Sequence, residues 1–410
     1  MPLSDSPAPQ TAEADSYSHP PGVIAGFSAW LLDALDFFLI TFCLTSIARE
    51  FHKSDAQIAL LITMTLAFRP VGGFIFGILA DRYGRRIPMM INMAVFAIAG
   101  ISTGLASSYN SLLLIRGLFG IVMGGTWGVG ASLAMESAPR ERRGVLSGML
   151  QEGYAAGNVL AAVLFFFLFK RVGWRTLFIV SSLPAIPLVF YIMFWVKESP
   201  AWRSQARIRL TWGEQHREVL RHWKLFLYLL AFMTAMMFAS HGTQDMYPTF
   251  LQREWHFTPE RRAVVTAISG IGAIAGGLAF GYFSDRKGRR RAIITAFCLA
   301  AVTIPLWAYA PNQALLILGA FIMQFAVQGA WGVIPAHLAE LSPDSVRALL
   351  PGLAYQSGGV IASSVVYVEA LYAQKTSYAT AMALTAISVF VCASAMAWVG
   401  RERHGQRFGS

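Results

Sequence analysis

Seven ionisable side chains lie inside long apolar stretches of this sequence, where an ionisable group is costly and marks a candidate functional site. They are Asp33, Asp36, Arg69, Arg116, Glu152, His241 and Asp245. An arginine in such surroundings can bind a carboxylate through two parallel hydrogen bonds. A buried carboxylate whose arginine partner moves can take up and release a proton. The set therefore indicates a site that binds a small anion and transfers protons.

Arg69 is the most informative of these residues. It lies 12 residues before Asp81, where the apolar stretch ends. On a helix this separation is about 18 Å, which places Arg69 near the middle of a bilayer. We therefore expect Arg69 to bind the carboxylate of a substrate. The alternative is a structural ion pair with Asp33 or Asp36, and the two readings agree if a substrate competes for the arginine.

Asp33 and Asp36 lie three residues apart, so they share one face of a helix. Together with Arg116 they predict a proton switch, in which Asp36 carries the proton and Asp33 assists. The alternative is a static pair between Asp36 and Arg116 that fixes two helices.

His241 and Asp245 lie four residues apart on one helix face, so each can set the protonation of the other. Gln244 adds an amide that can orient a carboxylate or a hydroxyl group. We expect His241 and Gln244 to contact the substrate and Asp245 to take part in proton coupling. Tyr154 and Asn158 complete the predicted substrate-binding set. The alternative is a histidine that is merely hydrogen-bonded within its helix.

Four further ionisable residues lie near the ends of apolar stretches, where we expect them to be solvated or to form part of a latch. They are Glu136, His337, Glu340 and Glu369.

The elements that carry these residues are predicted to be membrane-spanning helices. Of the 410 residues, 55% are hydrophobic and 13% are charged, whereas a soluble protein has about 25% charged residues. Each apolar stretch must be helical, because lipid offers no hydrogen-bond partners to the backbone. The predicted spans are 23–47, 56–80, 87–107, 110–134, 144–169, 174–196, 224–250, 261–284, 291–310, 312–337, 348–373 and 377–399.

Charge sets the predicted orientation. Most of the 33 Lys and Arg residues fall in segments that are cytoplasmic if the amino terminus is inside. This bias explains the net charge of +11 without a nucleic-acid partner. The three cysteines lie far apart in apolar stretches and indicate neither a disulfide nor a metal site, and we expect no cofactor.

The chain divides into two six-helix halves over 22–196 and 224–400. A polar cytoplasmic linker over 197–223 joins them, and we expect cytoplasmic tails over 1–21, disordered, and over 401–410. The halves repeat at an offset of 204 residues. The repeated pairs include Gly72 and Gly276, Asp81 and Asp285, Arg82 and Arg286, Arg85 and Arg289, Trp127 and Trp331, Glu136 and Glu340, and Arg143 and Arg347.

The repeated loop predicts a gate. Asp81 and Asp285 lie where a helix leaves the membrane, within reach of neighbouring arginines and of the amino end of a nearby helix. We expect Asp81, Arg82, Arg85 and Glu136, with their repeats Asp285, Arg286, Arg289 and Glu340, to latch the cytoplasmic side in one state and release it in another. The alternative is a solvated basic loop that only sets topology.

Residues 77–86, G-I-L-A-D-R-Y-G-R-R, and their copy over 281–290, G-Y-F-S-D-R-K-G-R-R, resemble the best-known signature of the major facilitator superfamily. The resemblance extends over roughly 22–400. It implies an all-α membrane protein with twelve helices in two pseudo-symmetric bundles. Residues 30–38 resemble the first helix of proton-coupled sugar and aromatic-acid symporters. Arg116 resembles the fourth-helix arginine that pairs with the first-helix aspartate in sugar symporters. Residues 198–202 resemble a sugar-porter sequence.

Residues 240–249, S-H-G-T-Q-D-M-Y-P-T, resemble the seventh-helix signature of the fungal lactate permeases in the sialate–proton symporter family. Met237 stands where that signature has asparagine. The resemblance implies a proton-coupled symporter of a small monocarboxylate, with lactate or pyruvate as substrate.

Two other functions stay open. One is proton symport of sialic acid, a sugar or an aromatic acid. The other is a membrane-embedded enzyme or sensor, which the short hydrophilic break at 197–223 and the lack of a catalytic motif disfavour. The expected partners are a small carboxylate, protons and the lipid bilayer. We expect a monomer in the cell (inner) membrane.

Overall fold

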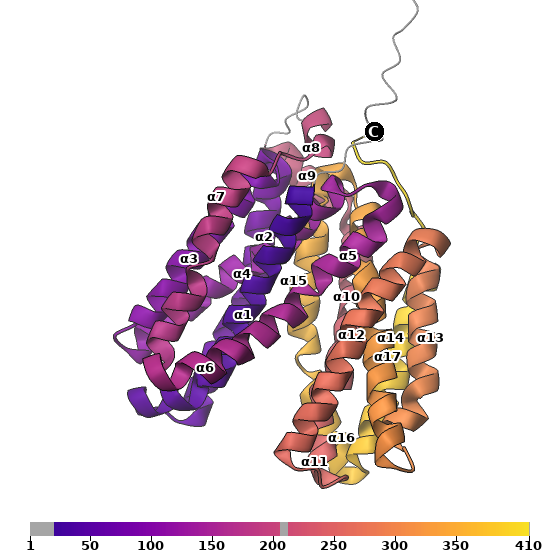
Figure 1. Cartoon of the computed structure of the whole chain (residues 1–410). Helices are drawn as coiled ribbons and strands as arrows, with labels where there is room; N and C mark the ends of the chain where they lie inside the picture. Colours follow the sequence, from indigo (N-terminus) through magenta and orange to yellow (C-terminus); the bar gives the residue numbers. More distant parts are fainter. Residues whose placement is uncertain (1–19, 206–211, 410) are drawn as a thin grey trace, which may run out of the picture.

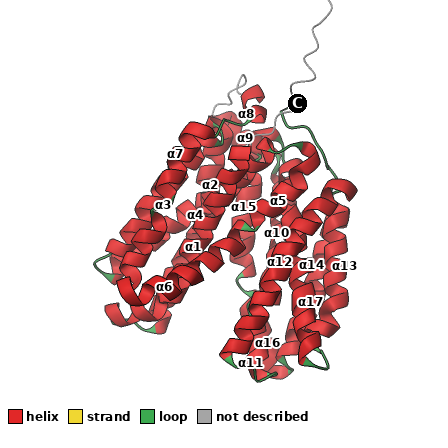
Figure 2. Ribbon diagram, in the orientation of Figure 1, coloured by secondary structure: helices red, strands yellow, loops and turns green. Residues whose placement is uncertain are grey.

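A computed structural model describes residues 20–205 and 212–409, and every regular element in this part of the chain is helical (Figure 2). The predicted tail over 1–21 lies almost wholly outside the described residues. The amino-terminal half comprises α1 (Pro20–Phe51), α2 (Asp55–Tyr83), α3 (Arg86–Leu105), α4 (Tyr109–Ser137), η1 (Arg140–Arg142), α5 (Arg143–Gln151), α6 (Gly153–Ser182) and α7 (Ala185–Trp195).

The predicted linker contains two short helices, α8 (Pro200–Gln205) and α9 (Trp212–Arg221). The carboxyl-terminal half comprises α10 (Trp223–Gln244), α11 (Tyr247–Arg253), α12 (Pro259–Lys287), α13 (Arg289–Ala308), α14 (Gln313–Leu341), η2 (Asp344–Val346), α15 (Leu349–Ala362), α16 (Val365–Lys375) and α17 (Tyr378–Val399).

Eleven helical stretches of the described chain are long and apolar enough to span a membrane. One of them, Arg140–Trp195, has 56 residues and contains both the fifth and the sixth predicted spans. The two spans meet at Gly173, whose φ of 70° and ψ of 174° are not helical. Glycine adopts this backbone conformation without the strain that a side chain would add. The twelve predicted spans are therefore all present.

Capping residues repeat with the halves. Ser54 and Ser108 begin α2 and α4, and each accepts a hydrogen bond from the backbone N–H three residues later. Their repeats, Thr258 and Asn312, begin α12 and α14 in the same way. Because each cap satisfies a backbone N–H that the helix leaves unpaired, the sequence fixes where these spans begin.

Small residues bring helices within each half into close contact. Gly72 of α2 lies against the backbone of Ile121 in α4, and its repeat Gly276 of α12 lies against the backbone of Phe325 in α14. Such contacts are typical of membrane helices, which associate by close packing rather than by exclusion of water.

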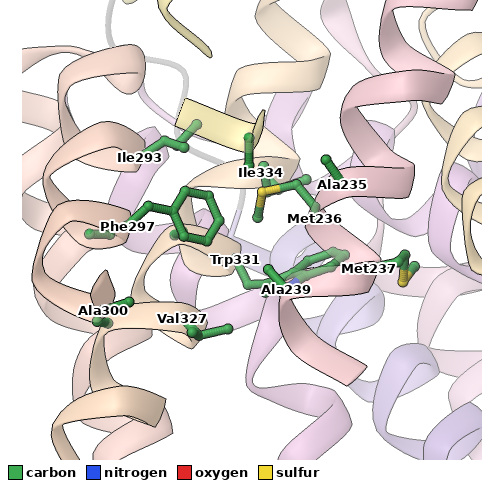
Figure 3. Packing of buried hydrophobic residues seen from close by; sticks show 14 of the residues in the cluster. Ala235, Met236, Met237, Ala239, Ile293, Phe297, Ala300, Val327, Trp331 and Ile334 are labelled. Carbon is green, nitrogen blue, oxygen red and sulfur yellow. The ribbon is translucent and has the colours of Figure 1, made fainter. Parts of the chain in front are cut away.

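One buried apolar cluster fills the carboxyl-terminal half and continues into α1, α4 and α5, and a second fills the rest of the amino-terminal half. In the carboxyl-terminal half, Met236 of α10, Phe297 of α13 and Trp331 of α14 pack together (Figure 3). Large apolar side chains on the outside, such as Phe166 at 75% exposed and Val302 at 77%, face the surroundings. In a membrane these side chains contact lipid, which explains why so few charges cover the surface.

The two halves lie against each other at the end that holds α8, α9 and the carboxyl terminus, and their ribbons diverge toward the other end (Figure 1). We call these the linker end and the far end. Across the halves, α5 packs against α12 and α14, and α15 packs against α2 and α4. A Cβ atom on Gly352 would lie 3.0 Å from the Cα atom of Gly128, and one on Gly148 would lie 3.0 Å from the carbonyl carbon of Gly277. Glycine at these positions allows the backbones of opposite halves to touch.

The orientation predicted from charge can be tested by labelling single cysteines. We replace Cys43, Cys298 and Cys392 by alanine and introduce either Ser107→Cys, exposed at the far end, or Arg142→Cys, exposed at the linker end. If the linker end is cytoplasmic, a membrane-impermeant maleimide labels Ser107→Cys in intact cells and Arg142→Cys only after permeabilisation. Labelling of Arg142→Cys in intact cells would show the opposite orientation.

Candidate functional site

Arg69 joins the two halves. It lies on α2, directly before Pro70, and its side chain is half-buried. Its Nε atom donates a hydrogen bond of 2.8 Å to Oε1 of Gln356 on α15, and the Gln356 amide donates one of 3.0 Å to the carbonyl of Gly124. The predicted carboxylate-binding arginine is therefore held at the contact between the halves by a neutral amide and not by an aspartate.

Tyr154 of α6 shows that predicted site residues from both halves converge. Its hydroxyl group lies in the electrostatic field of Arg69 and Asp33 from the amino-terminal half and of Asp245 from the carboxyl-terminal half. Its ring stacks on Trp30 of α1, with the ring centroids 5.3 Å apart. We call Arg69, Tyr154, His241, Gln244 and Asp245 the central polar site.

α10 supplies the second side of this site. His241 Nδ1 and Asp245 Oδ2 are 3.0 Å apart, and the two side chains are 41% and 39% exposed. The amide of Gln244 donates a hydrogen bond of 2.8 Å to Oε1 of Gln324 on α14, which is 6% exposed. Gln324 in turn donates to the hydroxyl of Thr243 at 3.2 Å. The spacing that was predicted to place His241 and Asp245 on one face does so, and Gln324 fixes the amide beside them.

Asp36 and Arg116 form a buried ion pair. Arg116 Nη1 lies 2.7 Å from Asp36 Oδ2, and the side chains are 0% and 1% exposed. The guanidinium group also lies over the ring of Phe119, 4.3 Å from its centroid, and its Nε donates to Thr65 at 3.3 Å. Asp33, one turn earlier, is fully buried, and neither of its carboxylate oxygens has a hydrogen-bond partner among the described residues. Asp36 therefore has an arginine partner at ion-pair distance, whereas Asp33 has no hydrogen-bonded partner among the described residues.

An aromatic cluster, which the sequence did not suggest, lies between the halves. The repeated residues Trp127 and Trp331 both pack on Tyr355 of α15, with centroid distances of 4.2 and 5.8 Å. Trp30 packs on the same ring at 5.9 Å. All four side chains are almost completely buried. The signal was present in the repeated Trp-Gly-Val tripeptide, but periodicity alone could not show that both copies meet one tyrosine.

Two sets of buried ion pairs hold the linker end together. In the first, Asp81 accepts hydrogen bonds of 3.0 Å from the backbone N–H groups of Ala348 and Leu349, at the start of α15. Asp81 also pairs with Arg85 at 3.2 Å. A carboxylate at a helix amino terminus is stabilised by the unpaired N–H groups and by the helix dipole.

Glu136 extends this first set across the halves. Its Oε1 atom lies 2.9 Å from Arg85 of its own half and 3.4 Å from Arg347 of the other half. Arg347 also pairs with Asp344.

The second set repeats the first with the halves exchanged. Asp285 accepts hydrogen bonds from the N–H groups of Gly144 and Val145, at 2.7 and 3.0 Å. Arg289 pairs with Asp285 at 2.8 Å and with Glu340 at 2.9 Å. Arg143 crosses from the amino-terminal half to Glu340 at 3.0 Å. We call the two sets the paired latches.

A further repeated pair completes the latches. Glu198 accepts hydrogen bonds from the backbone N–H groups of Arg85 and Arg86, and Glu402 accepts them from Arg289 and Arg290. Glu402 follows Glu198 by the same offset of 204 residues. Sequence reasoning missed this pair because Glu402 lies beyond the last span.

Arg82 and Arg286 differ from the other predicted gate residues. Their guanidinium groups lie over the rings of Tyr83 and Tyr282, at 5.6 and 4.3 Å from the centroids. Both tyrosines are exposed. Each arginine thus stacks on an exposed tyrosine of its own helix.

The remaining predicted residues have varied surroundings. Asn158 is exposed on α6, and Glu152 lies at the junction of α5 and α6, facing Gly277 of α12.

The expectation that Glu369 is solvated or part of a latch is wrong. Its side chain is 1% exposed, and it lies far along the chain from the residues of either latch. Among the described residues no group of three or more His, Cys, Asp or Glu side chains could hold a metal ion.

The fold and the site define a class of protein. Two related helical bundles meet at one end, and polar residues from both bundles converge between them, which is the architecture of a transporter that moves its halves about a central site. A family model described as Major Facilitator Superfamily matches residues 26–247 and 245–409. The chain belongs to this superfamily and is a transporter rather than an enzyme.

Relatives and solved structures agree with this assignment. A carboxylic acid transporter protein homolog of Saccharomyces cerevisiae is 30% identical over 92% of this chain and 67% of that protein. The sialic acid transporter NanX of Escherichia coli is 28% identical over 83% of this chain and 84% of that protein. The structure of the proton:xylose symporter XylE bound to 6-bromo-6-deoxy-D-glucose has a TM-score of 0.78 at 16% identity and covers 96% of this chain and 98% of that one, which supports the fold.

The Arg69 guanidinium group can be tested by a conservative substitution. We expect Arg69→Lys to fold and to lose transport by about tenfold or more, because an ammonium group cannot make two parallel hydrogen bonds to a carboxylate. The initial rate of uptake of a labelled carboxylate into proteoliposomes measures this loss of transport. Arg171→Lys, at an exposed arginine, is the matched control and is expected to keep wild-type rates. Uptake by Arg69→Lys at the wild-type rate would show that Arg69 does not bind the substrate carboxylate.

Proposed function

We propose that this protein is a proton-coupled symporter of a small monocarboxylate, with lactate or pyruvate as substrate. The observation that carries the proposal is the meeting of polar residues from the two halves. Arg69 is hydrogen-bonded to Gln356 of the other half, and the charges of Arg69 and of Asp245, the partner of His241, both act on Tyr154. A substrate held between the halves can couple their movement to its own passage.

In the proposed binding mode, Arg69 holds the substrate carboxylate and Tyr154 lies beside it. His241 and Gln244 then face the second carbon, where they can hydrogen-bond a hydroxyl or keto oxygen. Gln244 is suited to this role because Gln324 accepts a hydrogen bond from its amide N–H and so fixes the orientation of the amide. Asn158, exposed on α6, is the remaining proposed contact.

In the proposed coupling mechanism, Asp36 binds and releases the transported proton as Arg116 moves relative to it. Asp33 lies close enough to Arg69 and Asp36 for the charge of each to act on it. Asp245, paired with His241, is the proposed proton-binding group of the carboxyl-terminal half. The ion pair of Asp36 and Arg116 would then be the state in which that proton is absent.

The proposed orientation determines which side of the membrane the central polar site faces in this conformation. With the linker end in the cytoplasm, the paired latches close the cytoplasmic side, and the molecule faces outward. We infer that Asp81, Arg85 and Glu136, with their repeats Asp285, Arg289 and Glu340, separate when the site opens inward. We further propose that both termini are cytoplasmic and that a monomer functions in the cell (inner) membrane.

Relatives support an organic-acid substrate and also keep an alternative open. The yeast relative is named as a carboxylic acid transporter homolog, and another relative, in Cupriavidus pinatubonensis, as a probable 4-methylmuconolactone transporter. The similarity to NanX supports symport of sialic acid as the second candidate. Sialic acid carries a carboxylate and would use the same arginine.

Competition experiments separate these candidates. We expect lactate and pyruvate to inhibit the uptake of labelled lactate more strongly than propionate, by about three- to tenfold in inhibition constant, because propionate leaves polar groups of the site unpaired. Gln244→Ala is expected to narrow this gap. Thr380→Ala, at a half-buried position in the first turn of α17, is the control. Equal inhibition by propionate would show that residues of α10 do not hydrogen-bond the oxygen on the second carbon of the substrate. Uptake of sialic acid but not of lactate would favour the sialic acid symporter.

A further inference from the structure

Glu369 is a buried acid to which the mechanism above assigns no role. It lies on α16, and its side chain is 1% exposed. Neither of its carboxylate oxygens has a hydrogen-bond partner among the described residues. By the repeat offset its counterpart is Phe165. The scaffold therefore does not require a carboxylate at this position.

The Glu369 carboxyl group lies beside Gly242 of α10 and close to Thr385 of α17. A Cβ atom on Gly242 of α10 would lie 3.2 Å from Glu369 Oε1 and 3.3 Å from Cγ2 of Thr385 on α17. The hydroxyl of Thr385 donates to the carbonyl of Ala381 at 3.0 Å. The carboxyl group thus fits between α10 and α17 at the one residue of this turn that has no side chain.

The charged groups near Glu369 offer it no cation. Asp245, at the end of α10, is the charge that acts on it most directly. Asp245 pairs with His241 at 3.0 Å, and α17 contains no acidic or basic residue. Lys224 lies at the opposite end of α10, and Lys375 ends α16 six residues later. An ionised carboxylate without a cation is strongly disfavoured in such surroundings, so the neutral, protonated form fits this conformation.

We propose that Glu369 is a further proton-binding residue, protonated in the conformation closed at the linker end. When the halves move, its O–H bond breaks and the proton passes to the carboxylate of Asp245 or the imidazole of His241. Glu369 is left as a carboxylate, and the reverse transfer restores it. Gly242 permits this exchange because it leaves room for the acid one residue away from His241. The inference rests on the proposed proton-coupled symport.

The test compares coupling with exchange in proteoliposomes. We first measure whether wild-type protein accumulates labelled lactate under an imposed pH gradient. No accumulation would overturn the proposed function itself. With coupling established, we expect Glu369→Gln to lower the proton-to-substrate ratio and to flatten the pH dependence of uptake. Exchange of lactate between loaded compartments should stay within about twofold of wild type, because this step needs no net proton transfer.

Two further variants make the result specific. Glu369→Asp keeps an ionisable group and is expected to restore part of the pH dependence. Glu260→Gln, the same change at an exposed position of the same half, is expected to match wild type. A wild-type proton-to-substrate ratio and pH profile in Glu369→Gln would overturn the inference alone. Failure of Glu369→Gln to fold would also contradict it, since glutamine has the shape and neutrality of the protonated acid.

Phe408, which follows the last span, contacts arginines of both halves. The ring of Phe408 lies against the guanidinium groups of Arg143 and Arg347, each 3.8 Å from its centroid. These arginines come from opposite halves and make the crossing contacts of the paired latches. One aromatic ring therefore contacts both latches at once.

Backbone groups around Phe408 reinforce these contacts. The N–H of Gly405 donates to Glu340 at 3.3 Å, and the carbonyl of Gln406 accepts from Arg143 at 3.1 Å. The N–H of Gly409 donates to Asp344 at 2.8 Å, and its carbonyl accepts from Ser204 of α8 at 3.1 Å. The segment 401–409 thus contacts both halves and the linker.

We propose that residues 401–409 form a strap that stabilises the state closed at the linker end and must leave before this end opens. The test uses Ser147→Cys, buried between α5 and α14, in a background without the native cysteines. We expect Phe408→Ala to speed maleimide labelling of this cysteine by about threefold or more, since two cation–π contacts are lost. Phe408→Trp should label as slowly as the parent. Equal labelling rates in Phe408→Ala and its parent, or labelling of Phe408→Trp as fast as Phe408→Ala, would overturn the strap.

Discussion

The closed end of the molecule depends on four arginines that are almost completely removed from water. Arg85, Arg143, Arg289 and Arg347 are each 3% exposed or less, and a buried charge is tolerated only with a partner. For Arg143 and Arg347 a carboxylate partner comes from the opposite half. Closing the halves therefore gives Arg143 its carboxylate partner and gives Arg347, which also pairs with Asp344 of its own half, a second one. Because separation would return both arginines and carboxylates to water, the latches can release without leaving an unpaired buried charge, which suits a gate better than a permanent joint.

The ionisable residues within the spans depart from the symmetry that the latches obey. Arg69 corresponds by the repeat to Ala273, Arg116 to Ala320, and Glu369 to Phe165. Asp33 and Asp36 correspond to Met237 and Ser240. The duplicated scaffold supplies the paired latches twice, whereas these ionisable groups within the spans occur once. A site with one orientation for an asymmetric substrate needs such a departure, because a symmetric pair of sites would bind the substrate in two opposite directions.

Local patterns determined most of what could be predicted from the sequence. Hydropathy located the twelve spans, and the four-residue spacing of His241 and Asp245 placed them on one face, because both follow from helix geometry alone. The burial of Glu369 could not be predicted, since it depends on Gly242 and Thr385, which belong to other helices. The same reason applies to Tyr355, which both repeated tryptophans contact, and to Phe408, which lies outside any apolar stretch but contacts two distant arginines. Contacts between segments far apart in the chain leave no period in the sequence.

Charge balance gives a reason why substrate and proton would move together in the proposed mechanism. Burial disfavours the charged form of Asp33, and Arg69 partly offsets this cost, so an empty site with Asp33 ionised carries no net charge from this pair. A bound monocarboxylate neutralises Arg69 instead, and an ionised Asp33 would then be an uncompensated buried charge, which is costly at membrane depth. A proton held by Asp33, which assists Asp36 in the proposed proton transfer, removes that charge. The site is thus balanced when it is empty or when it holds both substrate and proton, and a half-loaded site is penalised in either direction. This electrostatic rule needs no direct contact between the proton and the substrate, only a shared arginine.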